Sequence, residues 1–146
     1  MKTRIKIDQL EPEAYQAMMV MEKYLAQSTI EPVLVSLIKI RASQLNGCAY
    51  CIEMHANEAL KQGESQNKLF ALSAWRESPL FSEKEKAAFT ITEEITHISN
   101  GGVSDKTFEF VKCFFTANEI ASLIMLIGTI NTWNRIAVST QMFHEE

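Results

Sequence analysis

Residues that interrupt helices are scarce in this chain. It has five glycines and three prolines in 146 residues, and no stretch alternates polar and apolar side chains for long. Such alternation is typical of a half-buried β-strand, whereas apolar residues that recur every three to four positions indicate an amphipathic helix. No low-complexity tract, internal repeat or linker is visible. The sequence therefore predicts an all-α fold in which residues 1–146 form a single domain.

An excess of positive charge is also missing. Fourteen Lys and Arg stand against eighteen Asp and Glu, which gives a net charge of −4, and no basic cluster occurs. Surfaces that bind nucleic acid usually carry such a cluster. We therefore expect no nucleic-acid partner.

Long hydrophobic runs are absent as well. The longest apolar stretch, residues 120–130, is interrupted by Ser122, Gly128 and Thr129 and is too short to cross a bilayer. Residues 1–6 are not followed by the apolar run of a signal peptide. These observations predict a cytoplasmic protein without a membrane partner.

Cysteine is rare, and the number of cysteines is odd. Three cysteines suit a reducing compartment better than a secreted domain held together by disulfides. Cys113 stands alone in an apolar run, and free cysteines are among the most buried side chains in proteins. We expect Cys113 to be a small core residue, which leaves Cys48 and Cys51 as a pair.

The pair belongs to a Cys-x-x-Cys-x-x-x-His motif formed by Cys48, Cys51 and His55. In a helix, offsets of three, four and seven residues place all three side chains on one face. Two thiols this close can form a disulfide, and an imidazole one turn farther along can accept a thiol proton. The pattern favours a redox dithiol. The alternatives are an inert structural pair and a metal site, which would need a fourth ligand; we expect no bound metal or cofactor.

Two neighbours of the cysteines should lower the pKa of the thiols. We expect a helix cap at Asn46, so that the free N–H groups and the dipole of the next helix favour a thiolate. His55 can stabilise the same thiolate as an imidazolium. Gly47 has no side chain and would let another group approach the sulfurs closely.

The remaining elements are predicted from apolar periodicity and from capping patterns. Ser82 with Glu85, and Thr116 with Glu119, match the capping box that opens a helix. The expected helices cover about residues 12–26, 32–45, 48–63, a segment around Leu69 and Trp75, 83–98, a short segment after Ser104, and 117–142. The methionines of the first helix and the apolar last helix predict a homo-oligomer.

Three segments resemble one protein family. They are residues 41–51 together with His55, residues 74–81 and residues 130–136. They closely resemble the alkylhydroperoxidase AhpD-like, carboxymuconolactone decarboxylase superfamily. The resemblance covers nearly the whole chain from about residue 10 and points to the peroxidase-like branch, because the decarboxylase branch lacks the Cys-x-x-Cys.

The resemblance implies a fold, an activity and a set of site residues. The fold would be an AhpD-like helical bundle of about six to eight helices that oligomerises. Cys51 would attack a small peroxide substrate, Cys48 would resolve the product, and His55 would belong to the proton relay. The cycle runs from thiolate through sulfenic acid to a disulfide. A dithiol electron donor protein would then reduce that disulfide.

The chain departs from the family pattern at position 36. The family usually has a glutamate twelve residues before the first cysteine, and this chain has Ser36. A serine hydroxyl can form hydrogen bonds, but it cannot hold negative charge near neutral pH. Glu93 also falls where related sequences carry a glutamate and is a fourth candidate catalytic residue; the alternative is a solvated or structural role.

Two functions are consistent with these residues. The first is a thiol-dependent peroxidase, an antioxidant enzyme that uses Cys48 and Cys51 for peroxide reduction or disulfide exchange. The second is a redox-sensing or binding protein on the same scaffold, with little turnover because Ser36 replaces the relay glutamate. Repeated turnover with a dithiol donor would distinguish the enzyme from the sensor.

Overall fold

The computed structural model describes residues 2–144 and is helical, without a β-strand in that part of the chain. Its helices are α1 (Ile7–Leu10), α2 (Pro12–Leu25), α3 (Pro32–Asn46), α4 (Ala49–Lys61), α5 (Gln66–Ala71), α6 (Glu83–Thr96), α7 (Asp105–Lys112) and α8 (Ala117–Thr140). Two short 3₁₀ turns, η1 (Leu72–Ala74) and η2 (Ile98–Asn100), follow α5 and α6. The all-α prediction is confirmed. Helix α1 was not expected, and the fourth predicted helix is divided into α5 and η1.

The helix starts follow the capping signals of the sequence. Ser82 accepts a hydrogen bond from the Glu85 N–H while the Glu85 carboxylate accepts one from the Ser82 N–H, and Thr116 and Glu119 form the same box at the start of α8. Each box satisfies two N–H groups that have no partner inside the helix. Pro32 opens α3, where a missing N–H removes no helical hydrogen bond.

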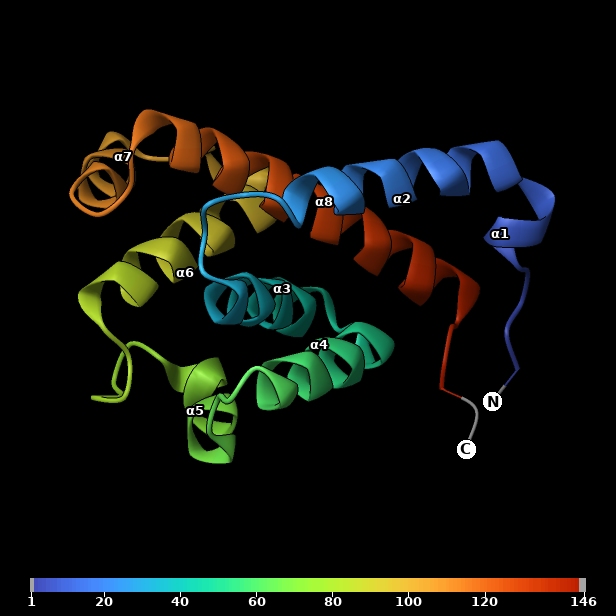
Figure 1. The fold of residues 1–146 in the computed structure, drawn as a ribbon, viewed down its shortest axis with the longest axis horizontal. Coiled ribbons are helices and arrows are strands. Elements are labelled where there is room, and N and C mark those ends of the chain that lie inside the picture. Colours follow the sequence, from blue (N-terminus) through green and yellow to red (C-terminus); the bar gives the residue numbers. More distant parts are fainter. Residues whose placement is uncertain (1, 145–146) are drawn as a thin grey trace.

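Helix α3 lies at the centre of the molecule (Figure 1). It packs against α4, α6 and α8, and α2 lies along α8. Because α3 has neighbours on several sides, its buried side chains are not confined to one face: Leu34, Ser36, Leu37, Ile38, Lys39, Ile40, Ala42 and Ser43. The C-terminal end of α3 and the N-terminal end of α4 are therefore held between packed helices. This is where the cysteines lie.

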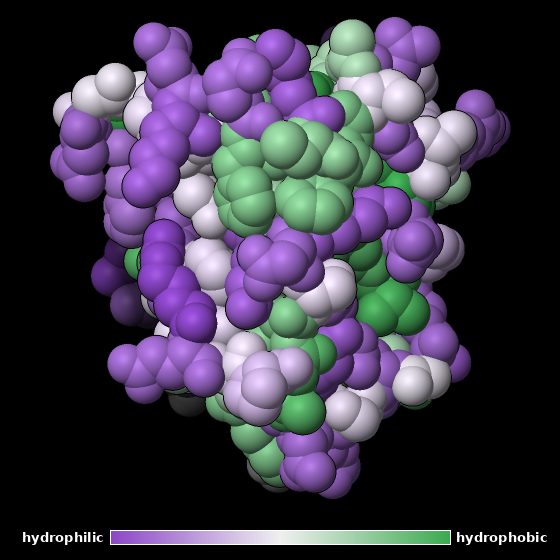
Figure 2. All heavy atoms as spheres, turned by 90° about the vertical axis from the view of Figure 1, so that its left-hand side faces the viewer, coloured by the Kyte–Doolittle hydropathy of each residue, from purple (hydrophilic) through white to green (hydrophobic). Residues whose placement is uncertain are grey.

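The surface carries several exposed apolar side chains. Figure 2 shows the side of the molecule on which α5 and α7 lie, where a hydrophobic patch is surrounded by hydrophilic residues. Phe108 on α7 and Phe114 after it are 40% and 36% exposed. None of the helices within residues 2–144 combines the length and the apolar character needed to span a membrane.

Candidate functional site

A tight turn between α3 and α4 holds the two cysteines. Asn46 is the last residue of α3, and Gly47 follows it with φ at 66°, a left-handed conformation that favours glycine. Cys48 is the N-cap of α4, and its sulfur accepts a hydrogen bond from the Cys51 N–H at 3.3 Å. The prediction that Asn46 caps this helix is therefore wrong by two residues. The reason is that α3 continues through Asn46 and the chain turns at Gly47.

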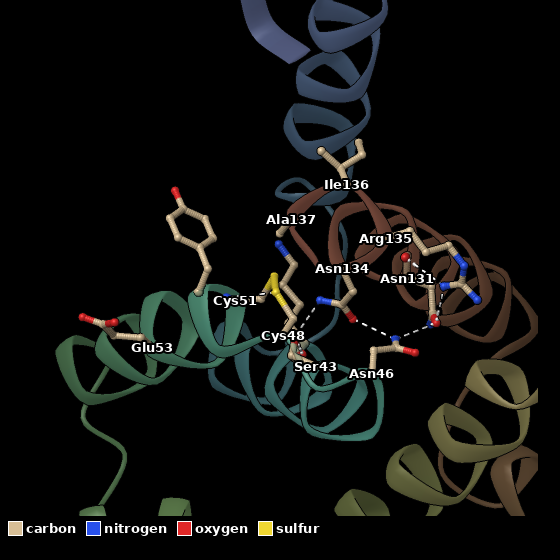
Figure 3. Close-up of a disulfide and its surroundings, with 12 residues drawn as sticks. Ser43, Asn46, Cys48, Cys51, Glu53, Asn131, Asn134, Arg135, Ile136 and Ala137 are labelled. Atoms are coloured by element: carbon tan, nitrogen blue, oxygen red, sulfur yellow. Dashed lines mark hydrogen bonds between the residues drawn. A yellow bond between two sulfur atoms is a disulfide. The ribbon is translucent and has the colours of Figure 1, made fainter. Parts of the chain in front are cut away.

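The structure joins Cys48 to Cys51 in a disulfide, with 5.3 Å between their Cα atoms. Both residues are buried, at 1% and 2% exposure, and pack with Ala137, Tyr50 and Met142. In Figure 3 the disulfide lies at the start of α4, beside the α8 segment that carries Ala137. The expected pairing is thus the one observed. Both sulfurs are enclosed by helix α8 and the residues after it.

Cys113 does not belong to the core, in contrast to the prediction. It is a free cysteine and is exposed. Its position explains the difference, because it follows the last residue of α7 at the surface, where its thiol donates a hydrogen bond to the Glu109 carbonyl at 3.4 Å. The apolar run around Cys113 buries Val111 and Phe115 instead.

A buried chain of amide side chains fixes the turn before Cys48. The Asn46 amide donates to Asn131 and Asn134 of α8, at 2.9 Å each. Asn134, which is fully buried, in turn donates to the Ser43 hydroxyl at 2.9 Å (Figure 3). Arg135 also donates to the Asn131 side-chain oxygen at 3.0 Å. These bonds attach the end of α3 to α8 and so set where the cysteines lie.

A cavity of about 290 Å³ opens beside Cys51. His55, which is 4% exposed, lines the same cavity, so the structure brings together two of the predicted site residues. The walls come from α2, α3, α4, α8 and the segment after α8, and they are largely aromatic or thioether: Tyr15, Met19, Tyr50, Met54, Trp133 and Met142. Cys48 does not line the cavity but is bonded to Cys51.

His55 has a carboxylate partner that lies outside the Cys-x-x-Cys-x-x-x-His motif and that the sequence did not predict. Its Nδ1 lies 2.7 Å from Oε2 of Glu58, three residues farther along α4. The hydrogen bond with His55 lowers the pKa of the Glu58 carboxyl, with smaller contributions from the positive charges of Lys39 and Lys61. The spacing alone could have revealed this pair, since residues three apart on a helix are neighbours.

A second carboxylate reaches the cavity from α2. Glu22 accepts hydrogen bonds from Lys39 at 2.7 Å and from the Trp133 indole at 3.0 Å. Glu22 and Lys39 both line the cavity with Glu58. The wall next to His55 is therefore charged, whereas the wall next to the sulfur is apolar.

Ser36 lies behind this charged wall. Its hydroxyl donates to the Gln62 side-chain oxygen at 3.0 Å, and it lines a separate cavity of about 510 Å³ that also touches Glu22, Lys39 and Glu58. Ser36 does not line the cavity of Cys51. The hydroxyl at position 36 is thus directed to the end of α4 and not to the dithiol.

Glu93 does not line the cavity of Cys51. Its carboxylate accepts hydrogen bonds from Trp75 at 2.8 Å, Arg41 at 3.0 Å and Arg76 at 2.6 Å. Burial alone would raise the pKa of Glu93, but these three donors outweigh it and the pKa is lowered. Glu93 of α6 thus forms ion pairs with Arg41 of α3 and with Arg76, which follows η1. We therefore leave Glu93 out of the dithiol site.

Known proteins resemble this chain over most of its length. Residues 12–94 match the carboxymuconolactone decarboxylase family. The uncharacterized protein YdfG of Bacillus subtilis is 40% identical over 139 residues, which cover 95% of each chain. A crystal structure of a protein of unknown function from Agrobacterium tumefaciens is 41% identical, with a TM-score of 0.96 over 99% of both chains. The name proposed for that protein is antioxidant defence protein AhpD.

A more distant neighbour shares the fold. The debrominase Bmp8 is 19% identical, with a TM-score of 0.80 over 94% of this chain and 74% of its own. At this level of identity the likeness concerns the helical architecture alone. The chemistry of this chain therefore has to be argued from its own cavity.

Proposed function

The chain belongs to the carboxymuconolactone decarboxylase family, and we propose that it is a thiol-dependent peroxidase of the AhpD-like kind. One observation carries the proposal: Cys51, bonded to Cys48, shares a cavity with the buried imidazole of His55. A thiol that can form a disulfide with its neighbour, beside a base that can take its proton, is the arrangement that peroxide reduction by cysteine needs. The name given to the Agrobacterium relative agrees with this chemistry.

The proposed cycle has three balanced steps. In the first, the Cys51 thiolate attacks the terminal oxygen of a hydroperoxide, the O–O bond breaks, and the leaving oxygen takes a proton to give an alcohol and a Cys51 sulfenic acid. In the second, the Cys48 thiol attacks that sulfur and releases water, which leaves the disulfide. In the third, an external dithiol exchanges with the disulfide and is itself oxidised.

The third step of the cycle determines which electron donor and which cellular compartment we propose for the protein. A dithiol donor protein has to reduce the pair, and such donors are kept reduced in the cytoplasm, which is where we place the protein. Cys48 and Cys51 are almost completely buried, and Cys51 lines the cavity, so the donor thiol has to reach the pair through that cavity, which Met142 also lines. We further propose that the functional unit is a homo-oligomer.

The test is steady-state consumption of cumene hydroperoxide with dithiothreitol as electron donor. We expect repeated turnover by the unmodified protein and by Cys113→Ser, and none by Cys51→Ser. The Cys113→Ser variant is the matched control, because it removes a thiol that lies outside the site.

The competing function is a redox sensor. Ser36 in place of the family's glutamate is the observation that favours it. A sensor would be oxidised once, to the Cys48–Cys51 disulfide, and would then stop in the presence of the donor. That result in the same assay would contradict the peroxidase.

A further inference from the structure

We propose that Glu58 is the positioning carboxylate of the dithiol site, and that Cys51, His55 and Glu58 form a Cys–His–Glu relay along one face of α4. The inference rests on the proposed function for the identity of the reacting sulfur. It gives Glu58 the task that the family resemblance assigns to a glutamate at position 36. This chain would thus supply its relay carboxylate from α4 and not from α3.

The spacing of the three residues supports the relay. Within α4 (Ala49–Lys61), positions 51, 55 and 58 are four and three residues apart and lie on the same helical face. The contact between His55 Nδ1 and Glu58 Oε2 is 2.7 Å, a length typical of charge-assisted hydrogen bonds. His55 is 4% exposed, so packing as well as this bond fixes the ring.

The bond to Glu58 determines which ring nitrogen is free. An ionised carboxylate can only accept a hydrogen bond, so in the neutral ring Nδ1 has to carry the hydrogen and Nε2 is left as the acceptor. Nε2 has no hydrogen-bond partner among residues 2–144, yet no fully buried side-chain nitrogen or oxygen in that range lacks one. Nε2 is therefore accessible, and the space open to it is the cavity that His55 lines with Cys51.

The charges around Glu58 favour its ionised form, which is the form that accepts the hydrogen bond of His55 Nδ1. Lys39 and Lys61 add to the effect of His55 and stabilise the carboxylate, while Lys39 itself is paired with Glu22. The Ser36 hydroxyl donates its hydrogen bond to the Gln62 side chain, so it does not compete with Glu58 for Nδ1. Position 58 is the one place in α4 from which a carboxylate bonds to His55.

The proton balance of the relay is simple. His55 Nε2 takes the proton of the Cys51 thiol and returns it to the leaving oxygen when the O–O bond breaks. Glu58 stays ionised throughout. It orients the His55 ring and stabilises the imidazolium, as the carboxylate does in other nucleophile–His–carboxylate sites. Glu58 is thus a positioning residue that acts through His55.

A double-mutant cycle tests this dependence. The rate of Cys51 oxidation by cumene hydroperoxide would be measured in the reduced protein and in Glu58→Gln, His55→Ala and the double variant. The signal is the tryptophan fluorescence of the protein, in which Trp133 lies in the cavity and Trp75 does not line it. We expect Glu58→Gln to lower the second-order rate constant by roughly 10- to 100-fold, part of the effect of a general base. In the His55→Ala background the same change should have no further effect.

The control is Glu53→Gln, which removes an exposed carboxylate from the same helix and should leave the rate unchanged. Two results would overturn the proposal. One is a Glu58→Gln rate equal to that of the unmodified protein. The other is the same loss from Glu58→Gln whether or not His55 is present.

Nitrogen-15 NMR of the His55 ring provides a readout that needs no peroxide. We expect hydrogen on Nδ1 in the neutral ring of the unmodified protein and a mixture of tautomers in Glu58→Gln. Glu58 has a side chain 46% exposed, so the variant should fold. If peroxide never oxidises Cys51, the proposed function fails while this spectrum still tests Glu58. A ring without the Nδ1 hydrogen, or unchanged by the substitution, contradicts the proposal.

Discussion

Among the individual residues, Glu58 and Glu93 show how the neighbouring side chains determine the role of a carboxylate. Glu58 is half-exposed and bonds to a single imidazole at the edge of a cavity. Glu93 is held by two guanidinium groups and an indole, with its side chain 15% exposed. Both have a lowered pKa, yet only Glu58 is placed to act on a reactive group. A perturbed pKa is thus compatible with either role.

Glu93 should therefore be a stability residue with a defined pH dependence. Its folded-state pKa lies below the ordinary 4.5, so its contribution is present above about pH 4.5 and is lost as the pH falls through the folded-state value. We expect Glu93→Gln to lower the free energy of unfolding by about 3 kcal/mol near pH 7, because Arg41 is left buried without its partner. The difference from the unmodified protein should shrink below pH 4.5. Urea denaturation at several pH values measures it.

The control for this prediction is Glu109→Gln. Glu109 is 69% exposed and pairs with Lys112 on the same helix, so its loss should change the free energy of unfolding by less than about 1 kcal/mol. If the Glu93→Gln difference had the same size at neutral and acidic pH, the carboxylate charge would not be its cause.

The sequence predicted contacts between residues that are close in the chain better than it predicted partners that are far apart in the chain. The Cys-x-x-Cys motif and its proximity to His55 follow from spacing inside one helix, and the His55–Glu58 pair was readable in the same way. The partners of Glu93 are up to 52 residues away in sequence, and no local pattern names them. The exposure of Cys113 also depends on where α7 ends and not on the apolar run around it.

At the scale of the elements, α8 holds the site together. Its polar side chains Asn131 and Asn134 point to the end of α3, and Ala137 covers the disulfide (Figure 3). The helix starts were predictable, because capping boxes involve residues three positions apart. The contact between Asn46 and Asn134 spans 88 residues and is fixed only by the packing of α3 against α8.

Asn134→Ala tests this attachment. The substitution removes two hydrogen bonds of the fully buried Asn134, the one it accepts from the Asn46 amide and the one it donates to the Ser43 hydroxyl, which should lower the free energy of unfolding by about 1–3 kcal/mol. Hydrogen exchange of the backbone at residues 46–51 should accelerate, because Asn46 keeps only one of its two hydrogen bonds to α8, the one to Asn131. Thr132→Ala, an exposed change on the same helix, should alter stability by less than about 0.5 kcal/mol. Equal effects of the two changes would argue against the attachment.

For the whole molecule, the fold alone determines neither the reaction that the protein catalyses nor its oligomeric state. The debrominase Bmp8 has the same architecture, so the activity depends on the residues of the cavity. Between α2 and α8 lies an apolar groove of about 760 Å³, lined by residues such as Met18, Met21, Ile124 and Met125. An apolar groove on the surface is a feature that interfaces between subunits bury.

We predict a homo-oligomer on these grounds. Light scattering at micromolar concentration should return a multiple of the chain mass of 16.6 kDa. The apolar side chains along α2 and α8 give the physical reason, since their burial between subunits removes them from water. A mass near 16.6 kDa throughout that concentration range would refute the prediction.

In the proposed cycle Cys51 is the thiol that peroxide oxidises. The most direct measurement is mass spectrometry of the reduced Cys48→Ser and Cys51→Ser variants after one equivalent of cumene hydroperoxide, with dimedone present to trap sulfenic acid. We predict a dimedone adduct on Cys51 in Cys48→Ser, because the resolving thiol is gone, and no adduct on Cys48 in Cys51→Ser. An adduct on Cys48 in place of Cys51, or no adduct in either variant, would show that Cys51 is not the thiol that peroxide oxidises.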